Sequence, residues 1–283
     1  MTTPRKILES RGIRPLKRLG QSFLGDRNVI SKIISILDIL CDDVVIEIGA
    51  GVGIMTEEIA RYAGRVIAIE IDPYMVKILR ERLKDYLNVE IVHADILAFD
   101  FSSVKHSLTN KKVKVIGNIP YYISSQILFR LIDYRSDISC MILMFQKELA
   151  DRLTAGPGTR KYGIPSVIVD MYTICTREMI IPGDCFYPAP KIISAVLKMV
   201  VRDTPQIDLK DHELFFKIVR ISFSKRRKTL LNNLRSLTRQ GYTEKDINQA
   251  LQISGIDGSR RGETLSTEEL GTLSNAFLLV KYS

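Results

Sequence analysis

The fold is decided by the stretch VVIEIGAGVG, residues 44–53. Its first half, VVIEI, is a β-branched run interrupted only by Glu47, which is typical of a strand buried within a parallel sheet. Glycines follow at 49, 51 and 53, and the next segment, IMTEEIARYAG, has its apolar residues at helical spacing. Glycine lets a backbone turn tightly and approach a ligand closely. The stretch therefore predicts a strand, a ligand-binding turn and a helix.

The same alternation continues downstream. Further strands are predicted at 65–72, 88–95, 112–120 and 139–146, with helical patterns between several of them. Strands joined by helical crossovers predict a doubly wound parallel sheet, which binds ligands at the carboxyl ends of its strands.

After residue 146 the alternation weakens. TREMIIP and KIISAVLKMVV predict an antiparallel addition to the sheet, and from about residue 205 the pattern is purely helical. We expect three parts, namely a basic N-terminal arm at 1–30, an α/β domain at 31–203 and a small helical domain at 204–283.

The glycine turn does not fit a dinucleotide. The fingerprint G-x-G-x-x-G/A fails because the sixth position from Gly49 is Ile54. Acids accompany three strands: Glu47 precedes the glycines, Glu70 is placed to accept from ribose hydroxyls, and Asp95 to accept from an adenine amino group. Three acids would repel a pyrophosphate but suit a nucleoside with a cationic centre, which describes S-adenosylmethionine. The alternative is that Glu70 and Asp95 only cap the following helices.

The tetrapeptide Asn118-Ile119-Pro120-Tyr121 ends the fourth predicted strand. An exocyclic amine on a base is a poor nucleophile, because its lone pair is delocalised into the ring. The Asn118 side-chain oxygen and the Ile119 carbonyl can accept its two N–H bonds and localise that lone pair, while Tyr121 stacks on the base. The alternative is a turn that simply uses Asn and Pro.

Positive charge is concentrated in two segments. The 283-residue chain has a net charge of +9, residues 1–32 hold eight basic and two acidic residues, and Lys217 to Arg239 hold eight basic and no acidic residues. Such segments favour contact with nucleic-acid phosphates. In the second segment a basic run, which consists of Lys225, Arg226, Arg227 and Lys228, stands with Phe215, Phe216 and Phe223 at helical spacing. The alternative is a solvated helix face over an aromatic core.

Cysteine and histidine usage limits other classes of function. The four cysteines form no CxxC pair, which indicates buried free thiols in a reducing compartment. The three histidines are scattered, so we expect no metal site, and no apolar run is long enough to span a membrane. We expect a cytoplasmic monomer.

The motifs closely resemble those of the KsgA/RsmA group of rRNA adenine N6,N6-dimethyltransferases. They cover nearly the whole chain in order: GQSFLGD (20–26), EIGAGVG (47–53), IEID (69–72), AD (94–95), NIPY (118–121), FYPAPKIISAV (186–196), SFSKRRKTLLNNL (222–234) and GETLS (262–266). The resemblance implies a Rossmann-like methyltransferase fold with a small all-helical C-terminal domain. It also implies S-adenosylmethionine as the cofactor and, as the substrate, two adjacent adenosines in the 3′-terminal hairpin of small-subunit rRNA within an immature subunit.

The resemblance also assigns site residues. Gly49, Glu70, Asp95 and Asn118 match cofactor contacts of the family, and we add Gly51 from the same glycine turn. Leu24 matches a backbone contact, and Phe186 matches an aromatic residue that sandwiches the flipped adenine opposite Tyr121. This chain departs from the family at Ser22, where many members have Asn, and at Ala50, where many have Pro. Ser22 remains a candidate cofactor ligand with a shorter reach. We expect segment 20–26 to order only with a ligand, because it has little apparent core.

Two alternatives remain open. One is an Erm-like dimethyltransferase that acts on large-subunit rRNA, against which KRRKTLLNNL and GETLS favour the small-subunit group. The other is a non-enzymatic ribosome-assembly or mitochondrial transcription factor of the same fold. The presence of Glu70, Asp95 and the NIPY tetrapeptide weighs against such a loss of catalysis.

Overall fold

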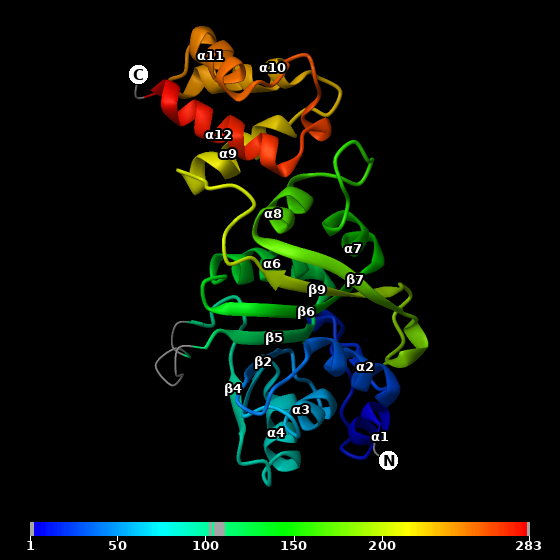
Figure 1. Ribbon diagram of the computed structural model, residues 1–283. Helices are drawn as coiled ribbons and strands as arrows, with labels where there is room; N and C mark the ends of the chain where they lie inside the picture. The colour runs from blue at the N-terminus through cyan, green and yellow to red at the C-terminus, as the bar shows by residue number, and fades with distance from the viewer. Residues whose placement is uncertain (1–2, 102–103, 105–110, 282–283) are drawn as a thin grey trace. The chain divides into compact units, whose positions relative to one another are not determined.

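The computed structural model describes residues 3–101, 104 and 111–281, and the chain divides into two compact units (Figure 1). The first unit comprises Met1–Ala150 and Thr176–Val201, and the second comprises Asp151–Cys175 and Arg202–Ser283. The second unit thus contains the segment 151–175 in addition to the C-terminal helices.

A seven-stranded sheet is the centre of the first unit. Its strand order is β4-β3-β2-β5-β6-β9-β7, with bounds β4 (Val89–His93), β3 (Arg65–Glu70), β2 (Val44–Ile48), β5 (Val113–Asn118), β6 (Ile138–Gln146), β9 (Ser194–Val201) and β7 (Thr173–Ile181). The strands from β4 to β6 pair in parallel, and β9 pairs antiparallel with β6. All five residues of β2 are buried, as expected for a central parallel strand. The predicted parallel sheet with an antiparallel addition is confirmed.

The strand order reverses direction between β2 and β5. From β2 the chain proceeds outward to β3 and β4, and it then returns to place β5 on the other side of β2. A crevice forms at such a switch point, outside the carboxyl ends of the strands. The glycine turn follows β2 and the NIPY tetrapeptide begins at the end of β5, so the topology brings them together.

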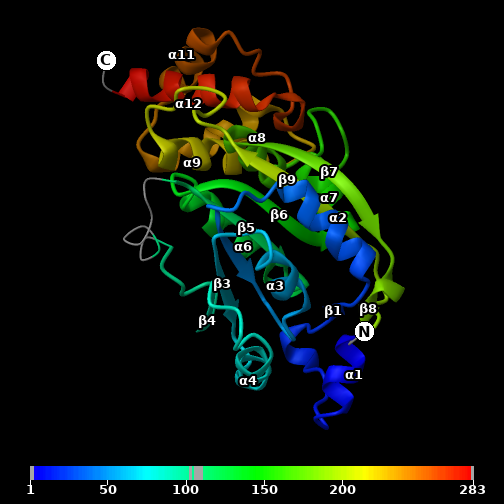
Figure 2. The ribbon, with the colours of Figure 1, turned by 60° about the horizontal axis from the view of Figure 1, so that its bottom comes forward.

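Helices of the first unit begin at clear sequence signals. Asp26 caps α2 (Arg27–Leu37) by accepting from two backbone N–H groups, and Asp72 caps α4 (Pro73–Arg82), which has Pro73 at its first position. α2 packs against β6 and β9, and α3 (Ile54–Ile59) packs against β3 (Figure 2). α6 (Ser124–Asp133) follows the NIPY segment.

The N-terminal segment has more core than its basic composition indicated. α1 (Pro4–Glu9) buries Ile7 and Leu8 within the main hydrophobic cluster. After the short helix η1 (Lys17–Leu19), β1 (Phe23–Leu24) pairs antiparallel with β8 (Phe186–Tyr187), which follows η3 (Gly183–Cys185). The burial of Leu24 and the pairing of β1 with β8 give segment 20–26 more core than the sequence indicated, while its ordering by a ligand stays a prediction.

The second unit is helical. It contains the C-terminal end of α7 (Lys147–Leu153) and the whole of α8 (Ile164–Tyr172), α9 (His212–Ser222), α10 (Leu230–Leu234), η4 (Arg235–Gln240), α11 (Glu244–Ser254), η5 (Gly262–Thr264) and α12 (Thr267–Lys281). α12 packs against α8, α9 and α11, and their apolar faces bury Phe215 and Phe277 completely. In the described part of the chain, no helix combines the length and the hydropathy needed to cross a membrane.

Candidate functional site

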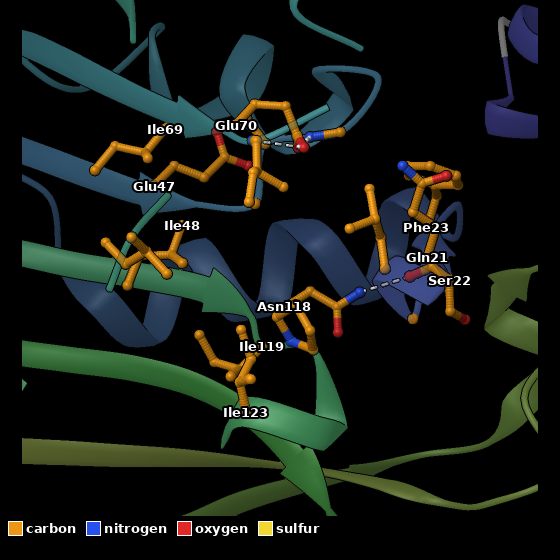
Figure 3. Close-up of a pocket in the computed structure, with 18 of the residues that line it drawn as sticks. Gln21, Ser22, Phe23, Glu47, Ile48, Ile69, Glu70, Asn118, Ile119 and Ile123 are labelled. Carbon is orange, nitrogen blue, oxygen red and sulfur yellow. Dashed lines mark hydrogen bonds between the residues drawn. The ribbon is translucent and has the colours of Figure 1, made fainter. Parts of the chain in front are cut away.

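A cavity of about 240 Å³ lies at the carboxyl ends of β2, β3 and β5 in the first unit (Figure 3). Its walls come mainly from segments 19–24, 47–52, 69–71, 94–97 and 118–123. Ten of the predicted site residues line it, namely Ser22, Leu24, Gly49, Gly51, Glu70, Asp95, Asn118, Ile119, Pro120 and Tyr121. Neither Phe186 nor the basic run at 225–228 is among the lining residues.

The glycine turn is shaped by steric constraints. Gly49, Gly51 and Gly53 have φ values of 71°, 58° and 78°, the left-handed region that favours glycine. A Cβ atom on Gly51 would lie 2.7 Å from Cδ1 of Phe23, so the ring of β1 covers the turn at van der Waals contact. A side chain is thereby excluded at Gly51, and Gly49 and Gly51 contribute only backbone to the cavity wall.

Glu70 holds the turn in place. Its buried carboxylate accepts the backbone N–H of Gly51 at 2.8 Å and those of Ile71 and Asp72 at 2.9 Å each. Burial raises the pKa of Glu70, and the hydrogen bonds from Asp72 and Gly51 oppose that rise. The sequence indicated a ribose contact but not this second role, which ties β3 to the turn after β2.

Glu47 is a buried acid with an unsatisfied oxygen. Only 1% of the residue is exposed, and its Oε2 has no hydrogen-bond partner among the described residues. Burial, together with the charge of Glu70, raises the pKa of Glu47 to about 8. Figure 3 shows the two acids on neighbouring strands. At neutral pH Glu47 is thus predominantly a neutral acid, which can donate a hydrogen bond as well as accept one.

Asp95 fits both interpretations that the sequence allowed. Its Oδ1 accepts the Leu97 N–H at 2.9 Å and caps the turn that follows β4. Its Oδ2 has no partner in the described chain, and the residue is exposed on the cavity wall. One oxygen is therefore structural, and the other is available to a ligand.

The Asn118 side chain is held in one orientation. Its Nδ2 donates to the Ser22 carbonyl at 2.7 Å, the bond drawn in Figure 3, which leaves Oδ1 as a free acceptor in the described structure. Tyr121, in η2 (Tyr121–Ile123), has its hydroxyl 2.7 Å from Ser194 Oγ on β9, and burial raises the pKa of Tyr121. The segment thus presents an oriented amide oxygen and an anchored aromatic ring.

Two site residues matched by resemblance have other partners here. The Ser22 hydroxyl donates to the Pro188 carbonyl at 2.9 Å, so its side chain joins β1 to the segment after β8. Phe186 pairs with Leu24 across the short sheet and is only 5% exposed, within the main hydrophobic cluster. In this structure Phe186 does not share the cavity with Tyr121.

Gln21 was not singled out from the sequence, although it lies in the GQSFLGD motif. Its Nε2 donates to Asp72 Oδ2 at 2.6 Å, and its Oε1 accepts the Leu16 N–H at 2.7 Å. Asp72 is 1% exposed and also caps α4. The pair ties the cavity-lining segment 19–24 to the end of β3, and the only signal for it was that both residues stand in the recognised motifs.

The basic run lies in a turn, so the prediction of a helix there is wrong. Residues 225–228 connect α9 to α10, and the Lys228 N–H bonds the Lys225 carbonyl at 2.9 Å. The helix does not continue because Thr229 caps α10 and Asn233 donates to the Ser222 and Lys225 carbonyls.

The four cations of this turn differ in their partners. Arg226 is 2.6 Å from Glu263 Oε2 and donates to the Tyr162 carbonyl at 3.2 Å. Lys225, Arg227 and Lys228 are exposed and have no acidic partner in the part of the chain that the structure describes. Lys225, Arg227 and Lys228 are therefore better placed to contact phosphates than Arg226, whose charge is already paired with Glu263.

The cysteines are free, but they are not all buried. Cys140 is buried, Cys175 and Cys185 are partly buried, and Cys41 is exposed in the turn before β2. The prediction of buried thiols is therefore wrong for Cys41. The described residues contain no cluster of three metal-ligating side chains, and His106 lies outside them.

Comparison with known proteins gives consistent relatives. A family described as ribosomal RNA adenine dimethylase matches residues 14–275. Ribosomal RNA small subunit methyltransferase A from Syntrophus aciditrophicus is 44% identical over 98% of this chain and 99% of its own length. The protein of the same name from Bacillus pumilus is 40% identical over 96% of this chain and 94% of its own.

Solved structures are similar over nearly the same length. A dimethyladenosine transferase from Plasmodium falciparum has a TM-score of 0.78 at 27% identity and covers 92% of this chain and 98% of its own. The 23S rRNA methyltransferase ErmE has a TM-score of 0.69 at 25% identity and covers 90% of this chain and 99% of its own.

Proposed function

This chain belongs to the ribosomal RNA adenine dimethylase family, and from that premise we propose that it dimethylates N6 of two adjacent adenosines in the 3′-terminal hairpin of small-subunit rRNA. The resemblance on which the sequence interpretation relied is confirmed. The curated relatives are named for the small subunit, whereas the large-subunit enzyme ErmE is the less similar of the two solved structures. We further propose that it acts as a cytoplasmic monomer on immature subunits.

The observation that carries the proposal is the fixed orientation of Asn118. Its Nδ2 donates to the Ser22 carbonyl at 2.7 Å, which fixes the orientation of the amide. The Oδ1 atom is thereby left as an acceptor for a ligand in the cavity. That oxygen and the Ile119 carbonyl would accept the two N–H bonds of the adenosine amine. The lone pair would then be localised and directed away from the ring plane. A preorganised polar group of this kind lowers the barrier by positioning and by electrostatic stabilisation.

The lining of the cavity fits S-adenosylmethionine. Its acids are Glu70, Asp95 and Glu47, the last of them mainly neutral at pH 7, and it contains no Lys, Arg or His among the described residues. That charge suits a cationic nucleoside and disfavours a pyrophosphate. Gly49 and Gly51 would let the cofactor approach the protein backbone closely. The free Oδ2 of Asp95 would accept a hydrogen bond from the adenine amino group, and Glu70 would accept one from a ribose hydroxyl. When bound, S-adenosylmethionine supplies a methyl group on a positively charged sulfur.

The chain needs no general base before methyl transfer. The attacking amine is neutral, and the methylated amine becomes acidic enough to lose its proton to water. The absence of histidine from the described lining is therefore compatible with the reaction.

Methyl incorporation into three substrates tests this function: immature small subunits, large subunits and naked rRNA. We expect dimethyladenosine at two adjacent positions of the small subunit. Incorporation into the large subunit alone would favour the Erm-like activity, and no incorporation into any of the three would favour a non-enzymatic assembly or transcription factor.

Cofactor binding is tested best at Asp95. Glu70→Ala should weaken S-adenosylmethionine binding, but it also releases the Gly51 turn. Asp95→Ala leaves that turn intact and removes one charged acceptor, for which we expect roughly a tenfold or larger loss of affinity. Calorimetry measures both, with Asp85→Ala as a control outside the cavity lining. Unchanged affinity in the Asp95 variant would contradict the assignment.

A further inference from the structure

We infer that Tyr122, with Lys17 and Arg18 of η1, forms a subsite for the nucleotide next to the target adenosine. Its base would stack on the Tyr122 ring and its phosphate would lie against the two cations. The inference rests on the proposed function, since it concerns RNA that enters the same cavity.

Tyr122 is an exposed aromatic residue on the cavity wall. It lines the cavity and is nevertheless 59% exposed. Single exposed aromatic residues are common on protein surfaces and need no explanation by themselves. Tyr74, for example, is 64% exposed but does not line the cavity. The position of Tyr122 on the cavity wall distinguishes the two.

The neighbouring residue Tyr121 is held differently. The Tyr121 hydroxyl is bonded to Ser194 Oγ, so its ring is fixed within the site. The Tyr122 hydroxyl has no partner in the described chain, and most of its side chain is accessible. The anchored Tyr121 ring is thus placed to stack on a base inside the cavity, and the accessible Tyr122 ring is placed to stack on a second base outside it.

The accessible ring lies next to the end of η1, the short helix that carries Lys17 and Arg18. A Cβ atom on Gly20 would lie 3.5 Å from Cδ1 of Tyr122, so the backbone that ends η1 packs on this ring. The Gly20 N–H bonds the Lys17 carbonyl at 3.0 Å, which fixes the short helix beside it. Lys17 and Arg18 are exposed and have no acidic partner among the described residues.

An accessible aromatic ring next to a helix with exposed cations suits the binding of single-stranded RNA. Bases stack on aromatic side chains with little sequence preference, while cations contact the backbone phosphates. A nucleotide flipped into the cavity leaves its neighbour partly unstacked, and the Tyr122 ring would replace the lost stacking partner.

The test combines Tyr122 variants with altered RNA. Small subunits are assembled on rRNA that carries an abasic site on the 5′ or the 3′ side of one methylatable adenosine. Methyl transfer is then measured for the wild type, Tyr122→Ala, Tyr122→Phe and the matched control Tyr74→Ala, with thermal unfolding to confirm folding. We expect Tyr122→Ala to raise KM about tenfold with little change in kcat, Tyr122→Phe to restore it, and Tyr74→Ala to have no effect.

The abasic site identifies the contact. For the wild-type protein, an abasic site on one side of the target should raise KM by the same factor of about ten. For Tyr122→Ala, the same abasic site should cause no further rise in KM. Fluorescence of 2-aminopurine at that position should be quenched by the wild type and by Tyr122→Phe but not by Tyr122→Ala. Lys17→Gln with Arg18→Gln should also lower the salt dependence of binding.

The outcomes separate the two proposals. If the wild type methylates the unmodified small subunit but Tyr122→Ala behaves as wild type on every RNA, the subsite is wrong and the proposed function stands. If the wild type transfers no methyl group to the small subunit, the proposed function itself fails. Equal losses in Tyr122→Ala and Tyr122→Phe would also overturn the stacking role.

Discussion

The cavity of the first unit and the basic turn of the second unit hold their polar side chains in opposite ways. At the cavity, Asn118 and Glu70 are engaged by backbone groups of other segments, and Glu47 is enclosed by the sheet. At the turn, Lys225, Arg227 and Lys228 extend into solvent.

This difference predicts two kinds of energetics. Buried polar groups cost free energy when they lose a partner and are weakly screened by salt, because water does not reach them. Exposed cations contribute through phosphate neutralisation, which is graded and depends strongly on salt. Substitutions at the cavity should therefore have large effects that salt hardly changes, and substitutions at the turn should have smaller, additive effects that vary with salt.

Asn118→Ala should have the largest effect. Loss of the oriented acceptor should lower single-turnover methyl transfer by about 10²–10³-fold, largely independent of salt. The same change also releases the Ser22 carbonyl, so Gln21→Ala serves as the control, because it loosens the same segment at Asp72 and keeps Asn118. An equal loss in Gln21→Ala would assign the effect to the segment and not to the acceptor.

Glu47→Gln should remove a pH dependence of stability. The pKa of Glu47 is about 8 in the folded chain against an ordinary value of 4.5, so its contribution is full below pH 4.5 and is lost as the pH rises toward 8. Between pH 6 and 8 the free energy of unfolding of the wild type should fall by about 2 kcal/mol relative to Glu47→Gln, because the slope of about 1.4 kcal/mol per pH unit lessens as the pH approaches 8. Urea unfolding across that range measures the difference, and parallel curves would contradict it.

Neutralising the turn should give an intermediate effect that depends on salt. Replacing Lys225, Arg227 and Lys228 by Gln should lower the slope of log affinity for small-subunit rRNA against log salt by about 0.7–0.9 per contact. Arg226→Gln is the matched control, because its cation is already paired with Glu263, and an exposed pair of this kind contributes little to stability. An unchanged slope in the triple variant would mean that these side chains only face solvent.

Ser22→Ala should have the smallest effect. Its hydroxyl bonds the Pro188 carbonyl, so its removal should cost about 1 kcal/mol of stability or less, the net value of a neutral hydrogen bond. Cofactor affinity should hardly change. A loss of several kcal/mol in calorimetry with S-adenosylmethionine would instead show that Ser22 is a direct ligand.

The parallel sheet and its ligand edge could be predicted because burial and glycine leave strong local patterns. VVIEIGAGVG reads as strand and turn without knowledge of any partner, and Glu70, Asp95 and Asn118 follow from the rule that parallel strands end at one edge. Of the three phenylalanines predicted to form an aromatic core, Phe215 is fully buried, whereas Phe216 and Phe223 are only partly buried.

What escaped prediction depends on contacts between distant segments. Gln21 donates a hydrogen bond to Asp72, which lies 51 positions away in the sequence, and Ser22 donates one to Pro188, which lies 166 positions away. Neither pairing leaves a local sequence pattern. The pKa of Glu47 depends on complete enclosure by the sheet. The turn at 225–228 did have a local signal, because Thr229 is a good N-cap, but the helical spacing of the phenylalanines outweighed it.

The contact between Phe23 and Gly51 constrains how this chain can evolve. A side chain at Gly51 would collide with the ring at 2.7 Å and would also be forced to a φ of 58°, so shrinking Phe23 relieves only one of the two penalties. Position 23 can therefore be substituted while position 51 keeps its glycine. Position 51 cannot be substituted without strain, even when position 23 carries a smaller side chain. Among descendants of this chain, the segment that covers the turn should diverge sooner than the turn itself.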